Sequence, residues 1–353
     1  MNTKRMDEGL ARMLQYENVA WYEKGCVKIL DRRIYPIEVK FVTCHHYTEV
    51  AQAISDMVTQ SAGPYTAAGM GMALAAYEAR LLNEKDQYQF LLDAAECISS
   101  ARPTTKDRLK QVVMGCLSVA KDNLGKNCDQ AIFQYTLQAM NNRYERIDRV
   151  ACELIKKMPK DARVMTQCFG ETIIGMMIRQ AQKNGINLKM VCPETRPFLQ
   201  GARFTASCAR DMGVDVTVIT DNMPAFYMEH EKIDLFTSAA DVICMDGSII
   251  NKVGTLQIAI CAKYFNVPYY CTGIPDLNHP DARSVDIEFR DPEETLSAHH
   301  IKHTLEGVKG YYPAFDITPP SLVSEIITDQ GSFLPNALDG YKADQANFYN
   351  FAV

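Results

Sequence analysis

The sequence predicts an α/β protein in which a Rossmann-like parallel-sheet domain follows a smaller, mostly helical N-terminal domain with a short β-hairpin. Three observations predict this. The 353 residues suffice for about two domains of ordinary size. Amphipathic helical patterns dominate residues 1–150. In residues 151–353, short β-rich runs alternate with helical patterns, which is typical of a parallel sheet covered on both faces.

In the N-terminal domain, a short helix precedes two runs of strand composition, Cys26–Leu30 and Ile37–Thr43. The segment Asp31–Pro36 between them predicts the turn of a hairpin. Amphipathic helices are then expected at Tyr47–Thr59, Ala67–Leu82, Lys106–Asn123 and Asp129–Lys157. The last of these leads into the second domain.

In the C-terminal domain, the expected strands are Val164–Gln167, Leu188–Cys192, Val214–Thr220, Leu235–Ser238 and Val267–Cys271. No glycine fingerprint of the G-x-G-x-x-G type follows the first strand. A dinucleotide-binding function therefore has little support, and no cofactor is expected.

Composition excludes several partners. The net charge of −6 gives no general attraction to nucleic acid or to an anionic membrane. The polar segment after Met1 has no signal-peptide core and no apolar run approaches a membrane span, so a cytoplasmic location is expected. The twelve cysteines are scattered singly, which indicates reduced core residues. No metal site is expected, and His299, His300 and His303 are interpreted as surface histidines.

Two residues stand out as candidates for chemistry. Cys168 and Asp241 each follow an apolar strand pattern, and we expect a helix to follow each of them. Ligands of open α/β sheets bind outside the carboxyl ends of the strands, so the two side chains can converge on one pocket. A helix N-terminus favours a thiolate, and a partly buried carboxyl at a strand end can keep its proton near neutrality. A core cysteine and an aspartate N-cap are the simpler alternatives.

The segments around these residues resemble a known family. Ala239 to Thr255 matches, without gaps, the signature G-A-D-R-I-x-x-N-G-x-x-x-N-K-I-G-T of the methylthioribose-1-phosphate isomerases, and Met165–Cys168 matches their L-T-H-C segment. The similarity extends to Glu194–Arg203, Arg290–Glu294 and Pro313–Pro319. Relatives with this fold include ribose-1,5-bisphosphate isomerases, 5-deoxyribose-disposal isomerases and the regulatory subunits of the initiation-factor-2 exchange factor.

The resemblance implies roles for individual residues. Cys168 and Asp241 fall on the family's catalytic pair, which the regulatory subunits lack, and this favours an enzyme. The matched phosphate-binding positions are Arg102, Gln200, Asn251 and Lys252. Arginine and lysine both suit a phosphate dianion.

Two departures from the family pattern concern lost arginines. Gln60 stands where the V-R-G-A-P segment has a phosphate-contacting arginine, and Val242 replaces the arginine after the catalytic aspartate. Both replacements weaken the transfer of the family's exact substrate to this chain. The isomerase reaction is therefore better supported than a methylthio group on the substrate. Loss of the arginine at position 60 also disfavours a bisphosphate.

The expected function is therefore an aldose–ketose isomerase, in which Asp241 is the acid at the ring oxygen and Cys168 the base near C2. The expected partner is a small sugar phosphate, 5-methylthioribose 1-phosphate before 5-deoxyribose 1-phosphate or ribose 1,5-bisphosphate. The resemblance also implies a homodimer. The alternative from another functional class is a non-catalytic regulatory subunit that senses a sugar phosphate.

Overall fold

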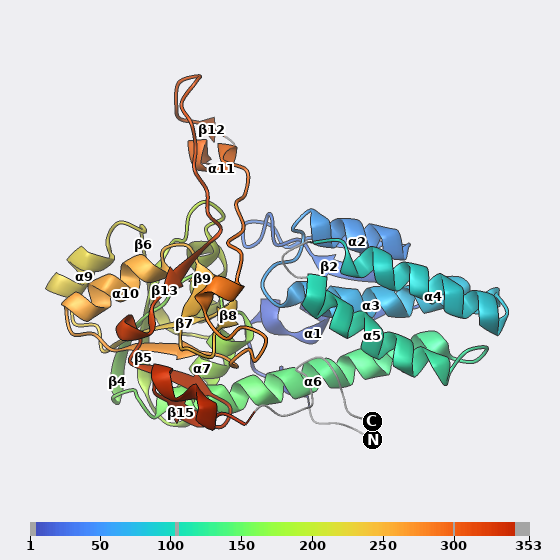
Figure 1. The fold of residues 1–353 in the computed structure, drawn as a ribbon, viewed down its shortest axis with the longest axis horizontal. Helices are drawn as coiled ribbons and strands as arrows, with labels where there is room; N and C mark the ends of the chain where they lie inside the picture. Colours follow the sequence, from blue (N-terminus) through green and yellow to red (C-terminus); the bar gives the residue numbers. More distant parts are fainter. Residues whose placement is uncertain (1–4, 103–105, 299–300, 343–353) are drawn as a thin grey trace. The chain divides into compact units, whose positions relative to one another are not determined.

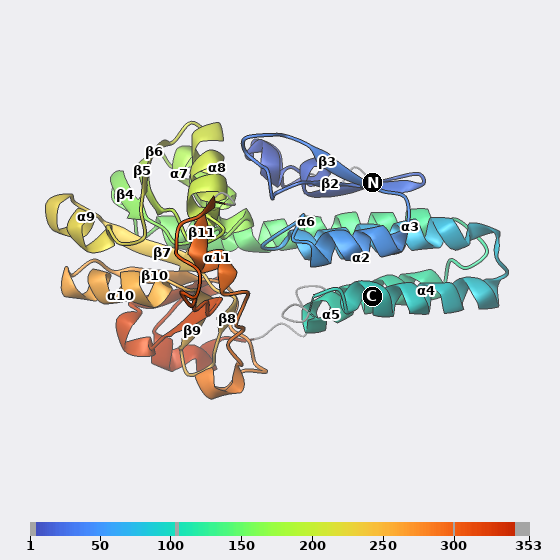
Figure 2. The ribbon, with the colours of Figure 1, turned by 90° about the horizontal axis from the view of Figure 1, so that it is seen from above.

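The computed structural model describes residues 5–102, 106–298 and 301–342. The chain divides into two compact units, with the boundary between Glu145 and Arg146. Helix α6 (Cys128–Ile155) crosses this boundary, so one continuous helix contributes residues to both units. Figures 1 and 2 show the elements of each unit from two directions.

The first unit combines a small antiparallel sheet with a group of helices. The sheet has the order β1 (Ala20–Glu23), β2 (Cys26–Leu30), β3 (Phe41–Cys44). The expected pairing of the second and third strands is present, with Val27 opposite Cys44. The short helix expected before the sheet is α1 (Tyr16–Val19), and strand β1 between it and β2 was not predicted. The helices that follow are α2 (Tyr47–Ser55), α3 (Gly63–Glu78), α4 (Glu84–Ser99) and α5 (Lys106–Lys121).

Helix α3 is the centre of the first unit. Fourteen of its residues, Gly63 to Ala76, are buried. A helix that is apolar on every side must be covered all round, and α3 contacts α2, α4, α5 and the sheet. Gly69 and Gly71 allow close approach, because a Cβ on Gly69 would lie 2.6 Å from Thr136. Helix α4 was not predicted from the sequence.

The second unit contains a seven-stranded sheet of order β15-β14-β10-β7-β4-β5-β6. All its neighbouring strands are parallel except β14 and β15. Numbered by position in the chain, the six parallel strands have the order 3-2-1-4-5-6, the doubly wound Rossmann arrangement. The Rossmann-like prediction is confirmed. The strands are β4 (Asp161–Met165), β5 (Asn187–Pro193), β6 (Asp215–Ile219), β7 (Leu235–Ala239), β10 (Tyr269–Thr272), β14 (Glu325–Thr328) and β15 (Gly331–Phe333).

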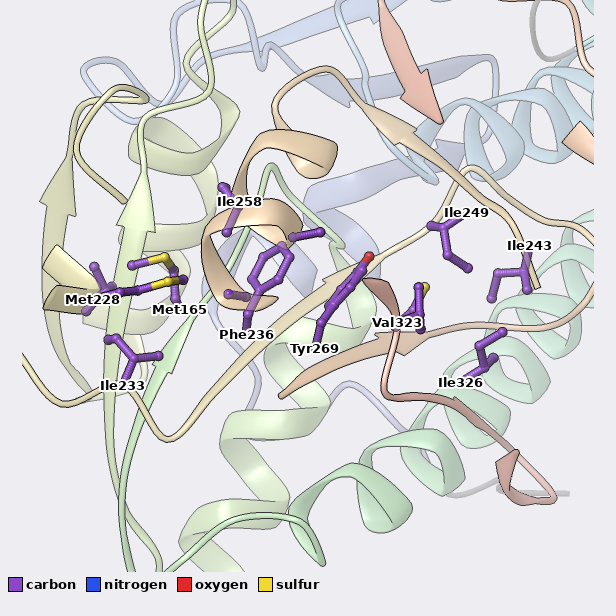
Figure 3. Packing of buried hydrophobic residues seen from close by; sticks show 14 of the residues in the cluster. Met165, Met228, Ile233, Phe236, Ile243, Ile249, Ile258, Tyr269, Val323 and Ile326 are labelled. Atoms are coloured by element: carbon purple, nitrogen blue, oxygen red, sulfur yellow. The ribbon is translucent and has the colours of Figure 1, made fainter. Parts of the chain in front are cut away.

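Helices α7 (Thr172–Lys183) and α8 (Ala206–Asp211) contact each other and strand β5, whereas α9 (Pro224–His230) and α10 (Thr255–Tyr264) contact each other. The core includes Phe236 of β7 and Tyr269 of β10, whose rings stack 4.4 Å apart (Figure 3). Ile258 of α10 belongs to the same cluster, which attaches that helix to the sheet. This apolar packing places the carboxyl ends of the strands.

Two smaller sheets interrupt the alternation of strands and helices. Between β7 and α10, the chain forms β8 (Val242–Ile243) and β9 (Ile249–Lys252), and β9 pairs antiparallel with β13 (Phe315–Thr318). The short helix α11 (Glu293–Leu296) precedes a two-stranded ribbon, β11 (Ser297–Ala298) and β12 (Ile301–Lys302). The β9–β13 pair brings residues far apart in the sequence beside the end of β7.

Candidate active site

The predicted pair lies at the switch point of the second unit. Strands β4 and β7 are adjacent and parallel, with Met165 opposite Phe236, and they are the two strands between which the order reverses. Cys168 follows the end of β4 and Asp241 follows the end of β7. A Cβ on Gly170 would lie 3.1 Å from Cβ of Ala239, so the two loops touch. This is the crevice in which open α/β sheets bind ligands.

The local structure after β7 differs from the prediction. Asp241 does not begin a helix: it is followed by strand β8, and α10 begins only at Thr255. The backbone N–H of Asp241 donates to the carbonyl of Ile250 at 2.9 Å, because the chain turns back as an antiparallel pair. The residue is exposed, whereas a partly buried carboxyl was expected. The helix N-cap alternative is therefore wrong for this aspartate.

Cys168 has a strained and well-fixed backbone. Its φ is +57°, in the left-handed region that non-glycine residues rarely adopt. Its N–H donates to Oγ1 of Thr195 at 3.2 Å, and Oγ1 of Thr205 donates to its carbonyl at 2.5 Å. Thr205 is fully buried. Two threonines from different segments thus hold the half-buried cysteine in one orientation.

The surroundings of the Cys168 thiol favour its protonated form in the absence of a ligand, whereas the sequence predicts a thiolate at a helix N-terminus. Its pKa is raised to about 11, chiefly by burial and also by the charge of Asp241, while Lys252 and Arg290 act in the opposite direction. Helix α7 begins at Thr172, so Cys168 lies outside the first turn, where the helix dipole is strongest. The charges of Asp241, Lys252 and Arg290 thus all act on the thiol.

Lys252 and Asn251 end strand β9, and both are buried. Nζ of Lys252 donates to the carbonyl of Ala314 at 3.0 Å and lies 4.6 Å from the ring centroid of Phe315. Nδ2 of Asn251 donates to Oγ1 of Thr255 at 3.0 Å. Strand β13 therefore orients the lysine that the sequence assigned to phosphate.

The β4 loop is attached to the turn after Lys252. Nε2 of Gln167 donates to the carbonyl of Val253 at 3.1 Å. Gly254 adopts φ +103°, and a Cβ there would lie 2.9 Å from the same Nε2. A side chain at position 254 would thus separate the cysteine loop from the lysine strand.

Gln200 belongs to the same unit. It is buried and precedes a π-helical turn, η4 (Gly201–Thr205), whose last residue is the threonine that holds Cys168. A Cβ on Gly201 would lie 1.8 Å from the carbonyl oxygen of Pro193, so only glycine fits there. Within the described part of the chain, Oε1 of Gln200 has no hydrogen-bond partner. A ligand donor could satisfy that oxygen.

The remaining predicted residues, Arg102 and Gln60, belong to the first unit. Arg102 is half-buried and follows the end of α4 at Ser99. Gln60 is buried in the loop between α2 and α3. The structure thus groups Cys168 with Asp241 and Lys252, and it places Arg102 and Gln60 in the other unit.

Sequence reasoning missed two charged residues of this site. Arg290 lies 5.8 Å from the ring centroids of both Phe198 and Phe315, and its Nε donates to Glu288 at 3.0 Å. Asp316 accepts the N–H of Gly254 at 2.7 Å, and burial raises its pKa to about 6. Both residues lie in segments that matched the family, so their chain positions were the available signal.

Other site types find no support in the described residues. No group of three or more histidine, cysteine, aspartate and glutamate residues within 5–102, 106–298 and 301–342 could hold a metal ion. His299 and His300 lie outside the described residues. No helix in the described part of the chain is long and apolar enough to cross a membrane.

A doubly wound sheet with a thiol and a carboxyl at its switch point has the architecture of a small-molecule binding domain. Residues 61–335 match the initiation factor 2 subunit family, and the chain belongs to it. This family membership confirms the resemblance seen in the motifs.

The relatives and solved structures fall into two groups. The methylthioribose-1-phosphate isomerase of Nostoc punctiforme is 34% identical over 91% of this chain and 95% of its own length, and that of Pelotomaculum thermopropionicum is 32% identical over 90% and 91%. The 5-methylthioribose 1-phosphate isomerase from Pyrococcus horikoshii OT3 has a TM-score of 0.78 and 28% identity, covering 90% of this chain and 93% of that one. The translation initiation factor eIF-2B subunit delta from A. fulgidus has a TM-score of 0.80 and 27% identity, covering 90% and 96%.

Proposed function

We propose that this protein is an aldose–ketose isomerase that converts a pentose 1-phosphate, with 5-methylthioribose 1-phosphate favoured, into the corresponding ribulose 1-phosphate. The observation that carries the proposal is the placement of Cys168 and Asp241 at the ends of the two strands that flank the switch point. Similarity to isomerases over about nine-tenths of the chain supports the same reaction.

The reaction explains why two titratable groups are needed. The anomeric oxygen of a sugar 1-phosphate is blocked, so the ring opens only if a proton reaches the ring oxygen as its bond to C1 breaks. Hydrogen then moves from C2 to C1, and the C2 hydroxyl loses its proton as the ketone forms. One proton enters and one leaves, and no external oxidant is required. An acid and a base therefore complete the reaction.

We assign the acid to Asp241 and the base to Cys168. The exposed aspartate can reach a bound sugar without rearrangement of the sheet. The cysteine must first lose a proton that burial retains, and the positive charges of Lys252 and Arg290 favour that loss. Fixing the sulfur through Thr195 and Thr205 keeps it in position for proton transfer.

Phosphate capture is assigned to Lys252, Asn251 and Gln200 in the second unit, together with Arg102 and Gln60 in the first. Buried Lys252 offers a positive charge in a setting of low dielectric, where electrostatic attraction is strongest. The expected homodimer and cytoplasmic location belong to this proposal too. Sedimentation of the purified protein tests the first of these.

The decisive experiment is a panel of pentose 1-phosphates that differ only at C5, carrying methylthio, hydrogen, hydroxyl or phosphate, with ketose formation as the readout. We expect the methylthio compound to give the highest kcat/KM. The C168S variant is the control for contaminating isomerase. Absence of turnover with every compound, by protein that still binds them, would overturn the proposal.

A second candidate is a non-catalytic, sugar-phosphate-sensing regulatory subunit. The close structural similarity to an eIF-2B delta subunit favours it, and Gln60 and Val242 are its sequence support. The panel separates the two functions, because a sensor binds a sugar phosphate without forming ketose.

A further inference from the structure

The loop Thr59–Gly63, which contains Gln60, has an unusual backbone. It joins α2 to α3, and two residues in or beside it, Met57 and Ser61, have φ of +59° and +57°. Such conformations in non-glycine residues persist only where surrounding contacts impose them. The loop is therefore held in its shape by other parts of the first unit.

Arg32 supplies two of these contacts. It follows strand β2, lies in none of the matched motifs, and its side chain is fully buried. Its backbone N–H donates to the carbonyl of Val58 at 2.8 Å, and its Nη1 donates to the carbonyl of Gln60 at 2.6 Å. A Cβ on Gly63 would lie 3.3 Å from that Nη1, so the guanidinium also reaches the first residue of α3.

A second buried cation reaches the same loop. Nη1 of Arg143, on α6, donates to the carbonyl of Ala62 at 3.2 Å. The start of α3, a helix of 16 residues, adds the partial positive charge of a helix N-terminus. Three sources of positive potential therefore converge on a segment of five residues.

The polar groups of the loop indicate a ligand. Oγ1 of Thr59 and Oε1 of Gln60 are buried, and neither has a hydrogen-bond partner among the described residues. The loop reaches the surface at Ser61. In a trans peptide the N–H points opposite to the preceding carbonyl, so the bond from Arg32 to the Gln60 carbonyl directs the N–H of Ser61 away from the arginine.

We propose that Arg32 is a positioning residue that orients the Gln60–Ser61 peptide and supplies the positive charge of an anion-binding loop, Thr59–Gly63, whose ligand is a phosphate group of the sugar phosphate. The inference rests on the proposed function. It explains the departure at position 60: the guanidinium of Arg32, which follows β2, replaces that of the arginine that the loop lacks. A further arginine at position 60 would add a third guanidinium beside Arg32 and Arg143.

The test uses the whole chain, inorganic phosphate as the probe, and calorimetry with thermal melting. R32M is expected to weaken phosphate binding by about tenfold, and R32K, which keeps the charge, to retain most of it. Q60R alone should lower the melting temperature without tightening binding. The double variant R32Q/Q60R should recover the wild-type melting temperature and the wild-type affinity for phosphate. R33M is the matched control, because Arg33 is paired with Asp31 and half-exposed.

Steady-state kinetics add a readout that general loss of stability would not produce. In R32M, KM for the sugar phosphate should rise while kcat is retained. The proposal is overturned if folded R32M binds phosphate as wild type does, or if Q60R tightens binding at an unchanged melting temperature; the latter test stands even if R32M does not fold. Phosphate binding that depends on Arg32 in a protein without turnover would retain this inference and reject the isomerase.

Discussion

The Cys168 loop and the Thr59–Gly63 loop make an instructive comparison. Both contain non-glycine residues with positive φ, and both are held by buried polar groups from other segments. The Cys168 loop retains the cysteine that the family motif has at this position. In the other loop, the motif position holds Gln60, and the positive charge comes from Arg32, 28 residues earlier in the chain.

The difference reflects what each function requires. Proton transfer needs one atom at one place, so the reacting side chain cannot move to another segment. Binding an anion needs positive potential over a region, and potential can come from any nearby segment. Motif positions are therefore a reliable guide to reacting groups and a weaker guide to electrostatic ones. The following predictions test that distinction.

The largest effect is expected from Cys168→Ser. A hydroxyl is a much weaker base than a thiol, so turnover should fall by about 10²- to 10⁴-fold while the fold persists. The isomerase rate and thermal melting should be measured together. Cys271→Ser, a change at a buried core cysteine, is the matched control and should retain turnover. Activity of C168S within a few fold of wild type would remove the thiol from the mechanism.

Asp241→Asn should also reduce turnover by about 10²-fold or more, because an amide cannot transfer the proton in the same way. Binding of the product should survive, since the side chain keeps its shape. Asp246→Asn, at another exposed aspartate of the same segment, is the control. Substantial turnover by D241N on a cyclic sugar 1-phosphate would assign the acid to another group.

The pH dependence of kcat/KM tests the charge state of Cys168. Its pKa is raised to about 11, so the thiolate fraction grows about tenfold per pH unit below that value. If the thiolate is the base, kcat/KM should rise with pH between about 7 and 10. A profile that is flat or falls over this range would contradict a thiolate base at Cys168.

Arg102→Ala is expected to weaken binding of any sugar 1-phosphate by about 1.5–3 kcal/mol, the usual contribution of charge-assisted hydrogen bonds. Titration calorimetry with the product measures this, and Arg108→Ala on α5 is a control in the same unit. Because Arg102 contributes electrostatic attraction and not a reacting group, the loss of affinity in R102A should be a smaller effect than the loss of turnover in C168S. Unchanged affinity would place the phosphate elsewhere.

Much of the fold could be predicted, for a physical reason. Strands of a covered parallel sheet have largely apolar runs, and five such runs appear as β4, β5, β6, β7 and β10 within a few residues of their expected ends, although β6 at the edge is mostly exposed. The strands β8, β9 and β13 were missed, because they are short and pair with distant segments. Helix α4 was missed although it has an N-cap, Asn83, that accepts the N–H of Asp86.

The site was predictable where position alone decides it. Cys168 and Asp241 could be placed at strand ends, because the carboxyl ends of parallel strands lie at one edge of a sheet. Their electrostatic states could not. Exposure of Asp241 depends on the β8–β9 turn, and burial of Cys168 depends on packing around its loop. Arg32 could not be recognised either, because its role depends on contacts with a distant segment, whereas Arg290 lies in a matched segment and was overlooked.

The smallest expected effect concerns Asp316, which links β13 to the start of α10. Its carboxylate accepts the N–H groups of Gly254 and Leu256, and burial raises its pKa from 3.8 to about 6. The folded state therefore binds this proton more readily than the unfolded state does. The group's contribution to the free energy of unfolding is most favourable below about pH 4, and it declines as the pH rises to about 6.

Asp316→Asn removes this titration and keeps an oxygen that can accept an N–H. We expect the stability of wild type relative to D316N to rise as the pH is lowered from about 6 to about 4, because only wild type gains the buried proton. Urea unfolding of both proteins across this range measures the difference, and subtraction cancels every other titrating group. Asp291→Asn, at an exposed aspartate, should show no such trend. If the difference in unfolding free energy between the two proteins is constant with pH, the Asp316 carboxylate is solvated well enough to titrate normally. Asp316 would then support the Gly254 turn only through the hydrogen bonds that it accepts.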